Sequence, residues 1–120
     1  MPIARLFELS NASGKINVNE IYDYNQNDLN SNEVMILDAW ETIFIWLGSE
    51  SNKQEREESE KVVFDYLKSD PSQRGVDIPI FKIKQGLEPP NFTGFFGPWD
   101  SEYSKVIKLR VLYKYKFRKY

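Results

Sequence analysis

Two short runs of β-branched and aromatic residues constrain the fold of this chain most strongly. Val34–Leu37 and Thr42–Leu47 are apolar at nearly every position, as is typical of the central strands of a sheet. Only Asp38–Glu41 separates them, so a tight turn is expected to join them, and Gly48 ends the second run. The chain therefore contains the centre of a sheet, to which its other elements must attach.

The rest of the sequence adds further strands and one long helix to this pair. Ala4–Leu9, Ile16–Ile21 and Ile78–Ile83 have the composition or the alternation of strands, and Ser51–Leu67 has the periodicity of a helix. Several strands, one helix and then another strand predict an α+β fold in which the helix covers at least one face of a mixed sheet. The length of 120 residues suits one domain.

The predicted helix has a capped start, an apolar stripe and a charged outer face. Ser51 or Asn52 can cap it, and Asp70 followed by Pro71 ends it. The apolar stripe at helical spacing consists of Ser59, Val62, Val63, Tyr66 and Leu67. Phe64 lies about 130° from the centre of that stripe, so we expect its ring to face solvent.

The composition excludes several classes of function. The chain has no cysteine and no histidine, which removes disulfides, thiolate metal sites and the usual proton shuttle. It also lacks a glycine-rich phosphate loop and a nucleophile elbow, so we do not expect an enzyme. Any metal must be bound by oxygen, which favours calcium or magnesium. No apolar run is long enough to span a membrane and no signal peptide is recognisable, which fits a cytoplasmic protein.

The charge is divided unevenly along the chain. Seven of the 16 basic residues and none of the 18 acidic ones lie in residues 105–120, so residues 1–104 carry a net charge of −9. Tyr113–Tyr120 alternates aromatic and basic residues, and its basic side chains are Lys114, Lys116, Arg118 and Lys119. We expect this tail to pack on a sheet edge or on the acidic body. Binding of these basic residues to lipid headgroups such as phosphoinositides is the second interpretation, and nucleic acid is the least favoured.

Three segments carry a more specific pattern: ARLFELSNASGKINVNEI, NEVMILDAWETIFIWLGSES and IPIFKIKQGLEPPNFTGFFGPWD. The second contains D-x-W-x-x-x-F-x-W-x-G, and the third contains K-Q-G-x-E-P-P-x-F. Together they resemble the gelsolin/villin family, and most closely its sixth, C-terminal repeat. The resemblance implies a gelsolin-like sandwich, in which a central mixed sheet of five or six strands lies between one long and one short helix. We assign residues 3–104 to this domain and residues 105–120 to the basic tail.

The resemblance also implies a calcium site. It assigns as ligands the backbone carbonyl of Asn32 and the carboxylates of Glu33 and Glu55, together with a carbonyl from beyond Trp99. The family usually has aspartate in the position of Glu33. A glutamate there moves the carboxylate by about one C–C bond, in a site where Ca–O distances are about 2.3–2.6 Å. From the residues themselves, Asp38 is expected to order its turn, and Trp40 with Trp46 to lie in or near the core.

The family binds actin, usually under calcium control, and in tight binders the outer face of the long helix enters a cleft between two actin subdomains. That face here consists of Glu57, Glu58, Lys61, Phe64, Asp65 and Lys68. Phe64 would be its apolar anchor, although a single exposed phenylalanine is a common surface feature and Glu58 stands where strong binders tend to be apolar.

We therefore expect a calcium-regulated actin-binding domain of the cytoskeleton, monomeric on its own. It would sequester actin monomers or cap barbed ends, and it would not sever filaments alone. The alternative is a regulatory latch or phosphoinositide-binding module with little affinity for actin.

Overall fold

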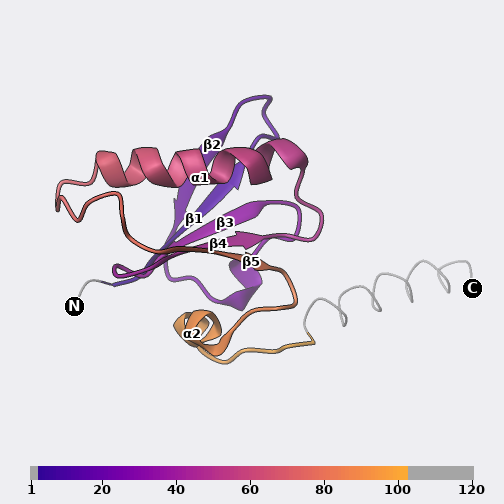
Figure 1. Cartoon of the computed structure of the whole chain (residues 1–120). Coiled ribbons are helices and arrows are strands. Elements are labelled where there is room, and N and C mark those ends of the chain that lie inside the picture. Colours follow the sequence, from indigo (N-terminus) through magenta and orange to yellow (C-terminus); the bar gives the residue numbers. More distant parts are fainter. Residues whose placement is uncertain (1–2, 103–120) are drawn as a thin grey trace, which may run out of the picture.

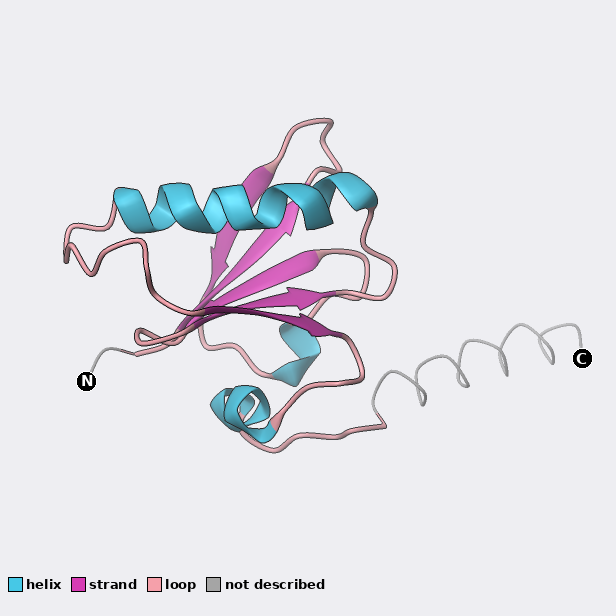
Figure 2. Cartoon of the chain, in the orientation of Figure 1, coloured by secondary structure: helices cyan, strands magenta, loops and turns pink. Residues whose placement is uncertain are grey.

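The structure is a computed structural model that describes residues 3–102, and it consists of one sheet with helices on both faces (Figure 1). The strands and helices are β1 (Arg5–Ser10), β2 (Asn17–Ile21), η1 (Gln26–Asp28), β3 (Val34–Asp38), β4 (Ile43–Leu47), α1 (Lys53–Lys68), β5 (Ile80–Lys84), α2 (Pro90–Thr93) and η2 (Gly94–Phe96). The long helix α1 lies across one face of the sheet, and the short helices lie beneath the other (Figure 2).

Within residues 3–102 the sheet has five strands, in the order β2-β1-β3-β4-β5. Neighbours are antiparallel except β4 and β5, which are parallel and are connected through α1. The two apolar runs of the sequence form the adjacent strands β3 and β4 in register, with Val34 opposite Leu47 and Asp38 opposite Ile43. This confirms the predicted fold: a mixed sheet of five strands between one long and one short helix.

The sheet separates two apolar cores because successive side chains of a strand point to opposite faces. The core under α1 consists of Phe7, Leu9, Val34, Ile36, Ile43, Ile45, Val63 and Leu67. The core over the short helices consists of Leu6, Leu29, Met35, Leu37, Phe44, Trp46, Ile83, Phe92 and Phe96. The central strands supply residues to both cores, which is why β3 and β4 are apolar at almost every position.

Helix α1 buries Glu55, Ser59, Val63 and Leu67, which recur every four residues along one stripe. The predicted stripe was therefore correct, with Val62 and Tyr66 half-buried at its edge. Of the two proposed caps, Asn52 is the one used. Among the described residues no helix is long and apolar enough to cross a membrane. The predicted basic tail, with Lys114, Lys116, Arg118 and Lys119, lies outside the described residues.

Candidate functional site

The N-terminal end of α1 is closed by a reciprocal pair of hydrogen bonds. The amide of Glu55 donates to Asn52 Oδ1 at 2.9 Å, and the amide of Asn52 donates to Glu55 Oε1 at 3.2 Å. This arrangement is a capping box, which satisfies amides that the first helical turn would otherwise leave without partners. Glu55 is only 1% exposed, so it is a buried carboxylate with a structural task.

The second oxygen of Glu55 connects the helix to the turn between β1 and β2. The amide of Asn11 donates to Glu55 Oε2 at 3.1 Å. The side chain of Asn11 also donates to Gln54 at 2.7 Å and accepts a hydrogen bond from Asn52 at 2.7 Å. Both oxygens of Glu55 therefore hold the helix end in place, and nothing in the sequence pattern had pointed to Asn11.

Glu33 is brought to this end of the helix by the backbone that enters β3. The amide of Gly48 donates to the carbonyl of Glu33 at 3.1 Å. A Cβ atom at position 48 would lie 2.4 Å from the carbonyl oxygens of both Glu33 and Ser31. Only glycine permits this close approach. The glycine of the W-x-G motif thus fixes the position of Glu33.

The two glutamates form a pair of like charges without a counter-ion among the described residues. Burial raises the pKa of Glu33 to about 7, and the hydrogen bond with Glu55 and the negative charge of Glu55 act in the same direction. A hydrogen bond from Ser10 opposes this rise and does not cancel it, while the charge of Glu8 adds to it. The Oε2 atom of Glu33 is buried and has no hydrogen-bond partner.

A cation bound between Glu33 and Glu55 would supply a partner for the unpaired Oε2 atom of Glu33. It would also offset the repulsion between the two carboxylates. Within residues 3–102 no group of three or more acidic, histidine or cysteine side chains could hold a metal ion. A metal site here would therefore need backbone carbonyls beside Glu33 and Glu55, such as that of the exposed Asn32. A further carbonyl ligand was expected from the segment beyond Trp99. In that segment the carbonyl of Asp100 accepts a hydrogen bond from Gln26 at 2.7 Å.

The C-terminal end of α1 is held by a complete network of hydrogen bonds and ion pairs. Tyr66 donates to Asp38 Oδ2 at 2.6 Å, and Arg74 forms ion pairs with Asp38 at 2.8 Å and with Asp70 at 2.7 Å. The guanidinium of Arg74 also donates to the carbonyl of Trp40 and lies 4.3 Å from the centre of its ring. The Arg74 and Asp38 side chains are 7% and 5% exposed, so the pair is almost removed from water.

The network also determines which of its groups are charged. Burial alone would raise the pKa of Asp38, but hydrogen bonds from Arg74, Tyr66 and the amide of Trp40 outweigh it and lower that pKa. Burial and the bond to Asp38 raise the pKa of Tyr66 to about 12. The pKa of Arg74 is raised by the same pairing. Asp38 is thus a firmly ionised carboxylate between a neutral phenol and a guanidinium.

Asp38 orders its turn as predicted, since its Oδ1 accepts a hydrogen bond from the amide of Trp40 at 3.0 Å. Trp40 is half-buried with a φ of 72°, and Trp46 is fully in the core at 2% exposure. The role of Arg74 was missed. It lies in an irregular loop 36 residues from Asp38, where no periodic pattern indicates a partner.

The K-Q-G-x-E-P-P motif also has a structural role. Glu88 accepts a hydrogen bond from the indole of Trp46 at 2.9 Å. Gln85 donates to Ser31 at 2.8 Å and accepts from the amide of Ser49 at 2.7 Å. These contacts tie the segment after β5 to the loops that precede β3 and follow β4. Two motifs far apart in the sequence are therefore parts of one packing arrangement.

The predicted outer face of α1 points away from the sheet. Phe64 is 45% exposed, and the ammonium of Lys68 lies 5.5 Å from the centre of its ring. Glu57, Lys61, Asp65 and Lys68 are exposed, whereas Glu58 is half-buried. The face is thus a phenylalanine surrounded by charges of both signs, and it extends to Lys68 at the C-terminal end of the helix.

The fold and these contacts define a class of protein: a single mixed sheet covered by one long helix, with an acidic pair at one end of that helix. The chain belongs to the gelsolin repeat family, because the family model of the gelsolin repeat matches residues 15–93. Curated relatives support the assignment to the gelsolin/villin family. The chain is 47% identical over 96 residues to advillin of Mus musculus, with 80% of the chain covered. It is 41% identical over 107 residues to gelsolin of Gallus gallus, with 88% covered.

The chain corresponds to a small part of these relatives, spanning 12% of the advillin and 14% of the gelsolin. Among solved structures, the Thorarchaeota 2DGel3/rabbit actin complex contains a chain that is 28% identical, with a TM-score of 0.68 over 80% of this chain and 47% of that one. A chain of the Thorarchaeota ProGel/rabbit actin complex matches with a TM-score of 0.63 at 19% identity, over 78% of this chain and 99% of that one. The latter likeness concerns the fold alone.

Proposed function

We propose that this domain binds actin through the outer face of α1 and that calcium controls it through the N-terminal end of the same helix. The observation that carries the first part is the exposed ring of Phe64, flanked by Lys61, Asp65 and Lys68 on α1. An aromatic anchor surrounded by charges is typical of a helix that docks in a groove. Two findings support actin as the partner: the chain belongs to the gelsolin repeat family, and a chain 28% identical to it was solved in complex with rabbit actin.

The calcium part rests on the carboxylate pair. Glu33 and Glu55 would hold the ion together with the carbonyl of Asn32, and a bound calcium ion would supply the positive charge that this pair lacks. Without it, Glu33 must either keep a proton or repel Glu55, as its raised pKa indicates. Glu55 belongs to the capping box and contacts Asn11, so a change at Glu33 acts directly on the start of α1. The proposal makes the position of the helix sensitive to one local charge.

A single domain of this kind offers one outer helix face, so we propose that it sequesters actin monomers or caps barbed ends. Severing would need a second actin-binding domain to keep the protein on the filament side. The chain spans 12% of the advillin and 14% of the gelsolin, so severing would belong to a longer protein if the chain is part of one. We place its action on the cytoskeleton, in the cytoplasm.

The test is binding of the full chain to monomeric actin, in calcium and in chelator. We expect binding that is stronger with calcium. Phe64→Ser should weaken it by about thirtyfold, which corresponds to about 2 kcal/mol. The matched control is Phe95→Ser, since Phe95 is 43% exposed against 45% for Phe64 but lies in η2 beneath the sheet. Equal losses from both substitutions would contradict the assigned face.

A pyrene-actin assembly assay then distinguishes the activities. Slower growth or monomer depletion supports capping or sequestering, and rapid fragmentation by the isolated domain would contradict the proposal. Absence of actin binding in both conditions would favour the regulatory alternative. In that case, cosedimentation with anionic vesicles tests the lipid interpretation, using a variant in which Lys114, Lys116, Arg118 and Lys119 are all replaced by serine.

A further inference from the structure

Strand β5 lies at one edge of the sheet, so the hydrogen-bonding groups along one side of its backbone face no neighbouring strand of the described residues. It pairs with β4 on one side, and no other strand of the described residues pairs with it on the other. An edge strand presents a row of amide and carbonyl groups that another extended chain can use. Addition of a strand to such an edge is a common way in which domains bind peptides.

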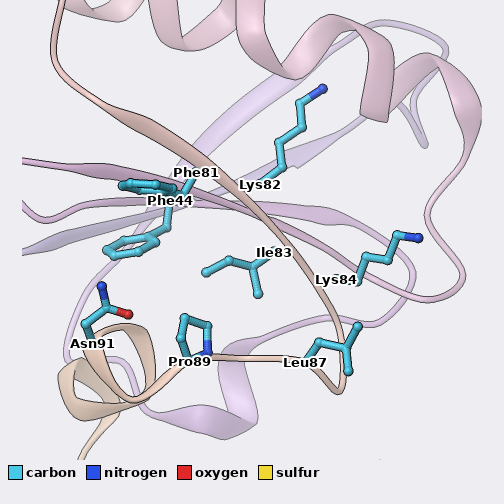
Figure 3. Close-up of a pocket in the computed structure, with 8 residues that line it drawn as sticks. All are labelled: Phe44, Phe81, Lys82, Ile83, Lys84, Leu87, Pro89 and Asn91. Carbon is cyan, nitrogen blue, oxygen red and sulfur yellow. The ribbon is translucent and has the colours of Figure 1, made fainter.

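An apolar groove runs beneath this edge, on the side of the sheet away from α1. It has a volume of about 620 Å³. Its lining residues are Phe44, Phe81, Lys82, Ile83 and Lys84 of the sheet and Leu87, Pro89 and Asn91 of the following segment. Figure 3 shows these side chains around one hollow below β5. Phe81 is 53% exposed and Leu87 is 74% exposed. Two large apolar side chains at the rim of one groove are more than scattered surface residues.

The opposite face of the same edge is cationic. Lys82 and Lys84 alternate with Phe81 and Ile83 along β5 and also border the groove. Figure 3 shows their long side chains extending away from the apolar ones. The ammonium of Lys82 lies 3.0 Å from Glu60, and the two side chains are 44% and 63% exposed. A pair this exposed is weak and open to competition from another acid. The edge therefore has an apolar side and a cationic side.

The other edge of the sheet does not have this cationic side. Strand β2 carries Asn17 and Asn19, and its sequence NVNEI contains no lysine. Lysines on an edge strand also serve to prevent pairing with other chains, which would account for Lys82 and Lys84 alone. Protection of the edge would not account for the groove, because exposed apolar side chains such as Phe81 and Leu87 do not help to prevent pairing.

We propose that the β5 edge binds an extended segment of a partner protein in which apolar and acidic residues alternate. The segment would lie along Ile80–Lys84 as a sixth strand, with its apolar side chains in the groove and its acidic side chains against Lys82 and Lys84. Opposite charges on neighbouring strands favour this orientation. The chain's own residues 105–120 fit less well, because they contain seven basic residues and no acidic one. The site lies along the β5 edge of the sheet, and its binding of the segment does not depend on actin binding.

The test uses the full chain and a short fluorescent peptide that alternates valine and glutamate. We expect saturable binding, seen as a rise in anisotropy, and slower amide hydrogen exchange in Ile80–Lys84. A peptide with lysine in place of glutamate should bind about tenfold more weakly, and one with N-methylated amides should not bind. Equal binding of the glutamate and lysine peptides would overturn the proposal.

Two substitutions on the protein locate the site. Leu87→Ser removes apolar surface from the groove and Lys84→Glu reverses one charge, and each should weaken binding about tenfold without altering the melting temperature. Val18→Ser on the opposite edge is the matched control, since Val18 is also an exposed apolar residue, and it should leave binding unchanged. If no peptide binds, the edge is either only protected by its lysines or filled by the chain itself, and the proposal is wrong.

Discussion

Both ends of helix α1 are tied to the sheet region through carboxylates, but the carboxylates have different partners at the two ends. At the C-terminal end, Asp38 lies between Arg74 and Tyr66, and its pKa is lowered. At the N-terminal end, Glu33 faces Glu55, its pKa is raised, and one of its oxygens has no partner among the described residues. One end is complete without a ligand, whereas the other lacks a positive charge.

The difference indicates where a ligand can act on this helix. A bound cation can change the free energy of the N-terminal end, because two like charges there are uncompensated. It has no comparable effect at the C-terminal end, where Arg74 already supplies the charge. The network at that end would keep the helix attached while the other end responds. Phe64 lies between the two ends, so a shift of the N-terminal end would also move the Phe64 ring.

The largest expected effect is at the C-terminal end. Asp38→Asn leaves the guanidinium of Arg74 buried without its main partner, and we expect a loss of about 3–5 kcal/mol in the free energy of unfolding. Denaturant unfolding in calcium and in chelator measures it, and the loss should be the same in both. Glu60→Gln is the control, since it breaks the exposed pair with Lys82 and should cost at most about 0.5 kcal/mol. If Asp38→Asn lowered the free energy of unfolding only in calcium, the proposal that calcium acts at the N-terminal end alone would be wrong.

The two ends should also respond to pH in opposite windows. The folded pKa of Glu33 is about 7 against an ordinary value of 4.5, so its contribution is complete below about pH 4.5 and is lost as the pH rises through about 7. The pKa of Asp38 is lowered, so its contribution is present above the ordinary 3.8 and is lost as the pH falls through the folded pKa. In chelator, raising the pH from about 5 to 8 should therefore lower the free energy of unfolding by on the order of 1–2 kcal/mol. If the free energy of unfolding in chelator did not change over this pH range, the result would contradict the view that Glu33 lacks a positive partner.

Glu33→Gln tests the N-terminal end of α1 alone, because it removes one of the two like charges there. In chelator at about pH 8 we expect this variant to be more stable than the wild type by about 1 kcal/mol. Calcium should no longer raise its melting temperature. Glu50→Gln is the control, because Glu50 is a nearby exposed acid outside the pair and should leave both properties unchanged. A calcium response that survives Glu33→Gln would remove this residue from the proposed site.

The smallest expected effect concerns the turn between β1 and β2. Asn11→Ala deletes side-chain hydrogen bonds to Asn52 and Gln54 but keeps the amide that donates to Glu55. Because these bonds are exposed to solvent, the loss should be about 0.5 kcal/mol. Thermal unfolding with and without calcium measures it. A loss of calcium response would mean that the turn itself belongs to the site.

The contrast between the two ends also shows what the sequence could and could not reveal. The strands, the helix and its buried stripe follow from local periodicity, because the spacing of Ser59, Val63 and Leu67 is itself the helical repeat. The turn at Asp38 was predictable for a similar reason, since an aspartate bonds the amide two residues along the chain.

Contacts between distant segments carried no such signal. Arg74 and Asn11 each lie in a turn or loop, and, apart from Asp70, their partners are 34 to 44 residues away. Nothing in the local pattern identifies which carboxylate a loop arginine will meet. The pairing of Glu33 with Glu55 came from the family resemblance, and the structure brings the two together. Their role as calcium ligands stays a prediction.

The central claim is that calcium acts on one end of α1. Amide hydrogen exchange of the full chain, in calcium and in chelator, tests it most directly. The account predicts that calcium slows exchange at Asn52–Arg56 and in the loop around Asn32, while exchange at Tyr66–Asp70 stays the same. Equal protection along the whole helix, or protection at its C-terminal end alone, would contradict the account.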